Sequence, residues 1–472
     1  MNYKQQILDK IAAGQEVVGV IGLGYVGLPL AVSFAQAGVE VIGFDKSKAK
    51  VDKINHGENY IKDIRDAVLR DVVEHVKLKA TTDFKKINEC DALLICVPTP
   101  LDQFRKPDMS FIEAACIDIG HYMKPGTFIC LESTTYPTTT EDFMLPLIEE
   151  SSKQNAWFKN LNITEGLPPA GAFGIEANPA SRNSHRAPLF KHGEDFWLAY
   201  SPERVDPGNA TFHTKNTPKV MGAMTPDGLE IGRQIYSKAI DHLHLVSSPR
   251  IAEMVKILEN TYRLVNISLI NELALLAGKM DINIWEVIEA AKTKPFGFQA
   301  FYPGPGIGGH CIPLDPFYLE HIAKKYNFDL SMIHAAGHIN MRMPHYMYIK
   351  IATALNRHKK AVNGSKVLFL GVAYKPNIDD ERESPALEIM DTVAHKGGIV
   401  SYNDPHIPLV TTHHGHTYHS VQLSAETLKE ADVVVLTTNH SAFDVEFIQQ
   451  NAQMIVDLRN MVKEGGEKVY KL

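Results

Sequence analysis

The sequence lacks any run of eighteen consecutive apolar residues, the minimum for a helix that crosses a bilayer. It also lacks a secretory signal, because Met1–Gly14 has at most the pattern of a short amphipathic helix. We therefore predict a cytoplasmic protein with no membrane partner.

Cysteine is scarce, with 5 residues in 472. The number is odd and no two cysteines have metal-ligand spacing, so we expect neither a disulfide framework nor a metal. Cys90, Cys96 and Cys130 lie in apolar, strand-like runs, which indicates reduced core residues. The net charge of −7 gives no reason to expect a nucleic acid partner.

What the sequence does have is an α/β rhythm that occurs twice. With 472 residues and 44% hydrophobic content, the chain is too long for a single core. We predict an α/β fold, with two Rossmann-like doubly wound domains joined by a long central helix and a helical middle region. The expected domains are residues 1–248, 249–362 and 363–472.

A dinucleotide fingerprint opens the first domain. The apolar run 16–21 predicts a buried strand, and Gly22-Leu-Gly24-Tyr25-Val26-Gly27 follows it and opens a helix over 28–37. The next predicted strand, 39–44, ends in Asp45. In such a loop the glycines admit a pyrophosphate to the backbone, and the acid accepts hydrogen bonds from the ribose hydroxyls. The Asp45 charge disfavours a 2′-phosphate, so we expect NAD.

Two further predicted strands, 92–97 and 127–131, end in polar loops. Pro98, Thr99 and Thr134 lie in these loops. Ligands bind outside the carboxyl ends of strands in open α/β sheets, so we expect the loops to face the cofactor. A turn or cap role for either threonine is an equally open alternative.

Residues 151–192 break this pattern, because they are rich in Pro, Gly, Asn and Ser and have no sustained periodicity. They predict either a functional flap or a tolerated surface insertion, and we favour the insertion.

Polar residues in the middle of the chain are the candidates for chemistry. Glu203 follows the predicted strand 196–200, although a surface acid is the plainer interpretation of that residue alone. Lys256 and Asn260 lie four residues apart on a predicted helix from 249 to about 280, hence on one face. That helix is apolar on more than one side, which predicts burial all round, between domains and against a second subunit.

A glycine-rich loop ends the middle region. Four glycines and two prolines precede Cys311, and Asp315 follows it. A thiol on such a loop is a candidate covalent nucleophile. A tight turn beside a buried structural cysteine is the alternative.

The last domain repeats the α/β pattern without the three-glycine fingerprint. Its first loop carries Lys375 and Arg382. These residues suit a phosphate or a uracil carbonyl, with a charged surface turn as the alternative.

Taken in order, GLGYVGLP, CVPTP, ESTTYP, YSPERVDPGN, the Lys256/Asn260 helix, GPGIGGHCIPLDP and YKPNIDDERES cover nearly the whole chain. The chain resembles the UDP-glucose/GDP-mannose dehydrogenase family. Its glycine-rich loop is most similar to the branch that oxidises UDP-N-acetylhexosamines. The resemblance implies oxidation of a sugar C6 alcohol to a carboxylate with two NAD⁺, for synthesis of a surface polysaccharide precursor. It also implies a homodimer or higher homo-oligomer.

By the family's pattern, the Cys311 thiolate forms a thiohemiacetal and then a thioester. Lys256 stabilises the oxyanion, Asp315 with Thr134 holds the hydrolytic water, and Glu203 shuttles a proton. Asn260 completes the predicted catalytic set. The predicted substrate contacts are Glu203, Arg204, Val205, Lys256, Asn260, Gly308, Gly309, Lys375 and Arg382.

The expected substrate is UDP-N-acetylglucosamine, with UDP-N-acetylmannosamine and UDP-glucose as alternatives. A two-electron hydroxyacid dehydrogenase and a non-catalytic NAD sensor are the other function classes. The three classes predict two, one and no NADH per substrate molecule.

Overall fold

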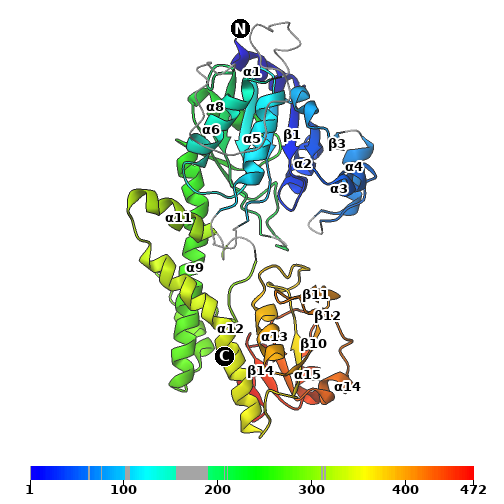
Figure 1. Cartoon of the computed structure of the whole chain (residues 1–472), viewed down its shortest axis with the longest axis vertical. Helices are drawn as coiled ribbons and strands as arrows, with labels where there is room; N and C mark the ends of the chain where they lie inside the picture. Colours follow the sequence, from blue (N-terminus) through cyan, green and yellow to red (C-terminus); the bar gives the residue numbers. More distant parts are fainter. Residues whose placement is uncertain are drawn as a thin grey trace, which may run out of the picture. The chain divides into compact units, whose positions relative to one another are not determined.

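The computed structural model describes residues 2–61, 64–75, 77–100, 107–155, 190–206, 208–209, 211–309, 312 and 315–472. The chain forms two compact units, residues 1–257 (unit 1) and 258–472 (unit 2) (Figure 1). Among the described residues, no helix has both the length and the apolar content of a membrane span.

Unit 1 is built on an eight-stranded sheet with the order β3-β2-β1-β4-β5-β6-β7-β8. Its strands are β1 (Val17–Ile21), β2 (Glu40–Phe44), β3 (Leu78–Thr81), β4 (Ala92–Ile95), β5 (Thr127–Leu131), β6 (Phe196–Tyr200), β7 (Lys219–Ala223) and β8 (Leu243–Val246). The central strands β4, β5 and β6 are buried at every residue. This explains why they are continuous apolar runs in the sequence, as in other sheets covered on both faces.

Helices cover both faces of this sheet. They are α1 (Tyr3–Ala13), α2 (Gly27–Gln36), α3 (Lys48–Asn55), α4 (Asp66–Glu74), η1 (Phe84–Glu89), α5 (Ser110–Tyr122), η2 (Thr139–Met144), α6 (Leu145–Ser152) and α8 (Pro226–Tyr236). Side chains of α1, α2, α3, α4 and α8 form one core layer, and those of α5 and α6 form the other. The sequence marks the start of α8, because Thr225 accepts the Gly228 N–H at 3.1 Å and Pro226 follows it.

One pair of neighbouring strands in the sheet of unit 1 is antiparallel. β7 is antiparallel to β6, with Ala199 opposite Ala223 and Tyr200 opposite Gly222, whereas the other pairs are parallel. The first residue of β7, Lys219, therefore lies at the edge where β5 and β6 end. The hydrophobic pattern of the sequence does not reveal this reversal.

The insertion predicted over 151–192 is too wide at both ends. Ser152 is the last residue of α6, and the Asn155 side chain donates to the Gly120 carbonyl at 2.6 Å and to the Met123 carbonyl at 3.0 Å. Phe190 is 1% exposed and packs in the core. These edge residues belong to the fold of unit 1, and residues 156–189 lie outside the described residues.

Unit 2 begins inside the long helix α9 (Pro249–Lys279). Its further helices are α10 (Ile284–Lys292), α11 (Asp315–Ala323), η4 (Lys324–Tyr326), α12 (Ser331–Arg357), α13 (Pro385–His395), α14 (Ala425–Glu430) and α15 (Val445–Asn451). Its parallel sheet contains β9 (Lys366–Leu370), β10 (Ile399–Asn403), β13 (Val433–Leu436), β14 (Ile455–Asp457) and β15 (Val469–Lys471), and β11 (Leu409–Thr411) and β12 (Thr417–His419) form a hairpin.

The two sheets share a topology. The order β10-β9-β13-β14-β15 in unit 2 repeats β2-β1-β4-β5-β6 in unit 1. In both units a glycine with positive φ follows the central strand, Gly22 (93°) and Gly371 (87°). Each donates its N–H to the last residue of the neighbouring strand, at 2.8 Å to Phe44 and 2.9 Å to Asn403. The predicted α/β fold with two Rossmann-like sheets is confirmed.

Candidate active site

The glycine loop after β1 has the geometry of a phosphate-binding turn. A Cβ on Gly22 would lie 2.6 Å from the Cys96 carbonyl oxygen, and one on Gly27 would overlap the Gly22 carbonyl. A Cβ on Gly24 would meet nothing within 4 Å. At the start of α2 the Leu28 and Leu30 N–H groups donate to the Gly24 and Val26 carbonyls and Pro29 has no N–H, so the Gly27 N–H is the donor of this first turn that lies beside the open position. Tyr25 and Val26 complete the turn.

Asp45 follows β2 and stands beside the same loop. Its Oδ2 accepts the Leu23 N–H at 3.1 Å and its Oδ1 accepts the Ser47 N–H at 2.8 Å, while Lys50 Nζ lies 3.5 Å away. Burial raises the pKa of Tyr60, whose hydroxyl donates to the Leu23 carbonyl, and the Asp45 charge adds to this shift. Each Asp45 oxygen keeps lone-pair capacity for a ribose hydroxyl.

The loops after β4 and β5 are tied to each other at the carboxyl edge of the sheet. The Thr99 hydroxyl donates to the Thr134 carbonyl at 2.8 Å, and the Ser133 hydroxyl donates to the Val97 carbonyl at 2.7 Å. Pro98 is exposed. In the part of the chain that the structure describes, the Thr134 hydroxyl has no hydrogen-bond partner. It is thus available to a ligand.

The structure brings Lys256 to the loop after β6. Lys256 Nζ donates to the Glu203 carbonyl at 2.7 Å, and the Lys256 residue is 8% exposed. The Glu203 carboxylate turns back on its own loop, where Oε1 accepts the N–H groups of Arg204 and Val205 at 2.8 and 2.7 Å. Arg204 itself donates to the Pro218 carbonyl at 2.7 Å. This contact resolves why a lysine is buried in an apolar helix.

In unit 2, the predicted residues Asn260 and Asp315 meet. The Asn260 amide donates to Asp315 Oδ2, and both residues are buried, at 5% and 2% exposure. The backbone N–H of Gly309 donates to the Arg382 carbonyl at 3.0 Å, and a Cβ on Gly308 would lie 2.6 Å from that of Tyr374. Cys311 lies outside the described residues.

The loop after β9 contains an ion pair between two of its own residues. The Arg382 guanidinium pairs with Asp380 through three hydrogen bonds, from Nε to Oδ1 at 2.9 Å and to Oδ2 at 3.1 Å and from Nη2 to Oδ2 at 2.6 Å. The cation is therefore already paired with an acid two residues away in the sequence. Lys375, in the same loop, is half-buried.

Sequence analysis missed Arg459, which follows β14 at the carboxyl edge of the second sheet. Its Nε donates to the Thr437 carbonyl at 2.9 Å. Burial lowers the pKa of Arg459 to about 10, and no carboxylate among the described residues pairs with it. It lies against Gly304 of the glycine-rich loop. The position of an arginine directly after a strand, in Asp457-Leu-Arg459, was the available signal.

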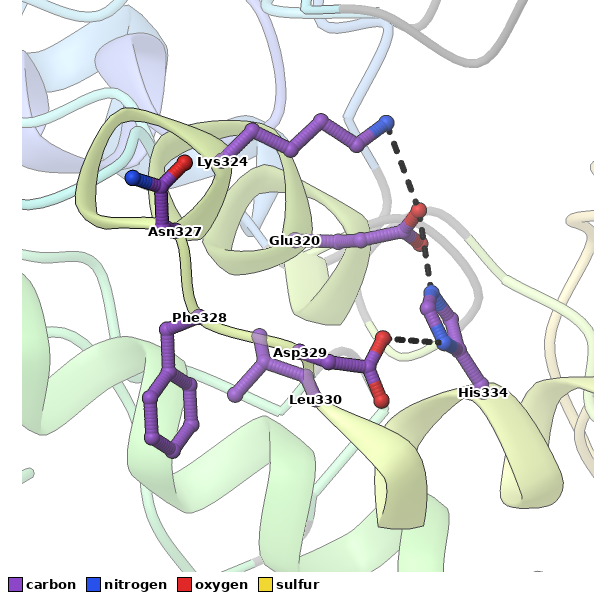
Figure 2. A pocket seen from close by; sticks show the side chains of 7 residues that line it. All are labelled: Glu320, Lys324, Asn327, Phe328, Asp329, Leu330 and His334. Atoms are coloured by element: carbon purple, nitrogen blue, oxygen red, sulfur yellow. Dashed lines mark ion pairs between the residues drawn. The ribbon is translucent and has the colours of Figure 1, made fainter.

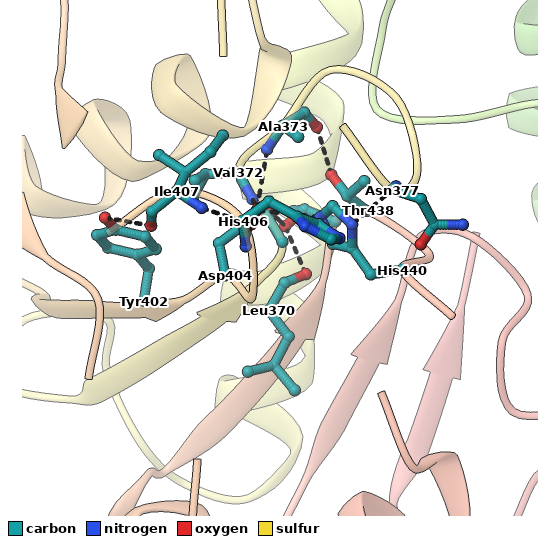
Figure 3. Close-up of polar contacts among 12 residues, drawn as sticks. Leu370, Val372, Ala373, Asn377, Tyr402, Asp404, His406, Ile407, Thr438 and His440 are labelled. Atoms are coloured by element: carbon teal, nitrogen blue, oxygen red, sulfur yellow. Dashed lines mark hydrogen bonds and ion pairs between the residues drawn. The ribbon is translucent and has the colours of Figure 1, made fainter. Parts of the chain in front are cut away.

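Asp404, at the end of β10, is enclosed by donors (Figure 3). The donors are the backbone N–H groups of Val372 (2.7 Å), Ala373 (3.2 Å), His406 (2.8 Å) and Ile407 (3.1 Å) and the imidazole Nε2 of His440 (3.0 Å). His440 Nδ1 accepts the Asn377 N–H at 3.0 Å, which fixes the proton on Nε2. Asp404 therefore holds loops of unit 2 together.

A cavity of about 380 Å³ lies where α11 connects to α12 (Figure 2). Its lining residues are Glu320, Lys324, Asn327, Phe328, Asp329, Leu330 and His334. The His334 ring bridges two carboxylates, with Nε2 3.0 Å from Glu320 and Nδ1 3.3 Å from Asp329. None of the predicted site residues lines this cavity. The histidine links α11 to the start of α12.

Three family models match the chain in order. They are described as the UDP-glucose/GDP-mannose dehydrogenase family NAD binding domain (residues 16–240), central domain (250–342) and UDP binding domain (368–464).

Individual proteins match over nearly the full length. NDP-N-acetyl-D-galactosaminuronic acid dehydrogenase of Ralstonia nicotianae is 33% identical, over 94% of this chain and 96% of the relative. UDP-N-acetyl-D-glucosamine 6-dehydrogenase of Pseudomonas aeruginosa is 30% identical, over 95% and 97%. The structure of UDP-D-ManNAc dehydrogenase from Pyrococcus horikoshii superposes with a TM-score of 0.80 at 30% identity, covering 96% of this chain and 98% of the other.

Proposed function

Because the chain belongs to the UDP-glucose/GDP-mannose dehydrogenase family, we propose that it oxidises the C6 hydroxyl of a UDP-N-acetylhexosamine to a carboxylate. The family is one of NAD-dependent UDP-sugar dehydrogenases, and NAD is the cofactor of this chain. The proposal rests chiefly on the open glycine turn of unit 1, where Gly24 faces open space directly before the start of α2. Relatives that act on three different N-acetylated sugars support the substrate class.

Unit 1 supplies the contacts for the cofactor. The turn around Gly24 binds the pyrophosphate, Asp45 accepts the ribose hydroxyls, and Thr99 and Thr134 lie toward the nicotinamide end. Pro98, Tyr25 and Val26 line the same edge. When bound, NAD accepts a hydride from the C6 carbon.

The chemistry needs two successive oxidations at one carbon. A base takes the proton of the C6 hydroxyl as the carbon becomes an aldehyde. The Cys311 thiolate then adds to that aldehyde, and loss of a second hydride converts the thiohemiacetal to a thioester. Water attacks the thioester, which releases the carboxylate and the thiol. Lys256 stabilises the oxyanions, and its hydrogen bond to the Glu203 carbonyl orients its ammonium group.

The remaining predicted residues have roles around this carbon. Asp315, oriented by Asn260, holds the hydrolytic water together with Thr134. Glu203 shuttles a proton. Each of these groups needs to be within hydrogen-bond reach of the reacting atoms in the complex.

The UDP group is held by unit 2. Arg459 is the candidate for one of its negatively charged oxygens, because it is a half-buried arginine whose guanidinium has no paired acid among the described residues. Lys375 is a second candidate. Arg382 is a weaker candidate for the UDP group than Arg459, because its guanidinium is already paired with Asp380. Its backbone carbonyl accepts the Gly309 N–H and so links the loop after β9 to the glycine-rich loop. Gly308, Arg204 and Val205 complete the proposed set of substrate contacts.

The choice of sugar is tested by NADH production under identical conditions. We take UDP-N-acetylglucosamine as the substrate and compare it with its manno and galacto epimers and with UDP-glucose. A sugar without the acetamido group leaves polar atoms of its pocket unpaired, so we expect UDP-glucose to have at least a roughly tenfold lower kcat/KM. A higher value for UDP-glucose would refute the N-acetylhexosamine assignment, whereas a preferred epimer would correct only the configuration.

The covalent step is tested by Cys311→Ser. The hydroxyl cannot form a thioester, so acid production should be lost while NAD affinity stays at the wild-type value. Mass spectrometry of the product and NADH fluorescence measure the reaction. If the variant still forms the uronate at a rate comparable to wild type, the covalent route is excluded.

We also propose that the protein is a homodimer that pairs along α9. In the single chain, Leu258 and Leu269 of α9 are 60% and 49% exposed, so the predicted burial of this helix on all sides requires a second subunit. Tyr262, Leu273 and Leu276 extend the same apolar face at helical spacing. A patch of this kind fits a second copy of itself. Light scattering should give a dimer for the native protein and a monomer for Leu269→Glu with Leu273→Glu.

A further inference from the structure

A buried ion pair underlies the loops of the proposed active site in unit 1. Glu132 follows β5 directly and is 1% exposed, and Lys219 opens β7 and is 5% exposed. The reversal of β7 is what brings the lysine to this edge. Tyr236, the last residue of α8, donates its hydroxyl to Glu132 Oε1. No role proposed above uses these three residues.

Lys219 connects two loops that carry candidate catalytic groups. Its Nζ donates to Glu132 Oε2 at 2.5 Å and to the Pro202 carbonyl at 3.2 Å. Glu132 stands two residues before Thr134, and Pro202 stands directly before Glu203. A single ammonium group therefore ties the loop after β5 to the loop after β6.

A second lysine holds the next carbonyl. Lys256 donates to the Glu203 carbonyl at 2.7 Å, while Lys219 donates to that of Pro202. The two lysines thus hold two consecutive peptide carbonyls. The position of the Lys256 ammonium depends on the Glu203 carbonyl that accepts its hydrogen bond. Displacing the peptide would move Glu203 and Lys256 together.

Stability alone does not require such a pair. Removing two charges from water costs free energy that their attraction often does not recover, and well-packed apolar residues serve as well. The specific result of the ionic arrangement is a directed hydrogen bond to the Pro202 carbonyl. An apolar replacement cannot make that bond.

We propose that Lys219, held in place by Glu132, is a positioning residue that sets the Glu203–Lys256 contact relative to Thr134 for the oxidation. This inference rests on the proposed function. Misplacement of reacting groups by about 1 Å lowers rates on the order of a hundredfold. Loss of the tie should therefore reduce kcat while NAD binding, which depends on the loop after β1, is retained.

The decisive variant is the double replacement Lys219→Met with Glu132→Gln, which removes both charges and leaves no unpaired buried ion. Lys124→Met is the matched control. Lys124 Nζ likewise contacts a carboxylate, Asp91 at 2.8 Å, and a backbone carbonyl, that of Glu89 at 2.9 Å. It does so at the opposite edge of the same sheet, where β4 and β5 begin.

The readouts are kcat with a UDP-N-acetylhexosamine, NAD affinity by fluorescence titration, and the melting temperature. We expect the double variant to lose about 10- to 100-fold in kcat with unchanged NAD affinity. The control should stay within about threefold of wild type in both. A double variant that keeps the kcat of the control, or that loses NAD binding in parallel with kcat, would overturn the proposal.

Should the double variant fail to fold, Glu132→Gln alone decides. The Gln oxygen still accepts from Lys219, so positioning predicts that kcat stays within about threefold of wild type in the folded protein. The melting temperature should fall, because the buried Lys219 ammonium loses its carboxylate. A large loss of kcat at an unchanged melting temperature would mean that charge and not geometry matters. Wild-type protein that forms no NADH from any UDP-sugar would instead refute the proposed function itself.

Discussion

Asp45 and Asp404 occupy the same topological position in the two units, directly after the strand that neighbours the central one. Asp45 accepts two backbone N–H groups and its side chain is 12% exposed. Asp404 accepts from five donors, including His440, and its side chain is 0% exposed. One carboxylate is left open to a ligand, and the other is enclosed by the fold.

The loops in front of these acids differ accordingly. In unit 1 the loop from 22 to 26 is short and leaves Gly24 facing open space. In unit 2 the loop runs from 371 to 384, and a Cβ on Gly371 would lie 2.5 Å from Thr438. The same strand order thus leaves an acid open in one unit, which we propose for the ribose hydroxyls, while the other unit has the cation Arg459, which we propose for an anionic ligand.

The largest expected effect is on unit 2. Asp404→Ala leaves the N–H groups around it and the His440 ring without an acceptor, so we expect unit 2 to lose at least about 4 kcal/mol in free energy of unfolding. Hydrogen exchange of the β9 and β10 amides measures it. Asp45→Ala is the matched change in unit 1, with an expected loss of about 1 kcal/mol or less. Equal losses in free energy of unfolding for the two variants would contradict the claim that only Asp404 is structural.

The second effect gives the units opposite pH dependences. Burial raises the pKa of Glu253 to about 7, although hydrogen bonds from Thr140 and Thr138 to its carboxylate act to lower it. Since this pKa lies above the ordinary value of 4.5, the stabilisation of unit 1 is complete below about pH 4.5. It is lost as the pH rises to about 7, to an extent of about 3 kcal/mol.

Asp404 has the reverse sign. Burial opposes its ionisation, but the hydrogen bonds from His440 and the backbone hold its pKa below the ordinary value. Its stabilisation of unit 2 is therefore present at neutral pH and is lost in acid. Urea midpoints at pH 5 and pH 7.5, followed for each unit by hydrogen exchange, should fall with pH in unit 1 only. Glu253→Gln should flatten the trend, and an unchanged slope would contradict the assignment.

A smaller effect tests the open acid directly. Asp45→Ser should weaken NAD binding about tenfold and relax the discrimination against NADP, because the ribose hydroxyls lose an acceptor and a repelling charge is removed. Isothermal titration with both cofactors measures the change. A native protein that already prefers NADP would overturn the role of Asp45.

The smallest effect is expected where unit 1 has a segment without a counterpart in unit 2. The β14–β15 connection runs from 458 to 468, whereas β5 and β6 are joined through residues 132–195. A deletion that joins Glu150 to Glu194 would remove the buried Asn155 and Phe190, so it should destabilise unit 1. A deletion limited to 156–189 should keep turnover within about threefold, since loop entropy changes slowly with length. Loss of activity in a folded protein would make the segment a flap.

The sequence predicted the strands and the glycine turn well, because a buried parallel strand and a phosphate turn each leave a local pattern. The strands at 127–131 and 196–200 are as predicted. The reversed direction of β7 and the enclosure of Asp404 could not be predicted, because each depends on which distant segments pair. Lys219 is one residue in an apolar run until the strand direction places it beside Glu132.

Unit 1 contains the NAD binding domain of the family and unit 2 contains the UDP binding domain, and we propose that the reaction is the four-electron oxidation of a UDP-N-acetylhexosamine. The most direct measurement is the amount of NADH formed for each molecule of UDP-N-acetylhexosamine consumed to completion. The account predicts two NADH and a C6 carboxylate. One NADH with an aldehyde product, or no NADH at all, would contradict it.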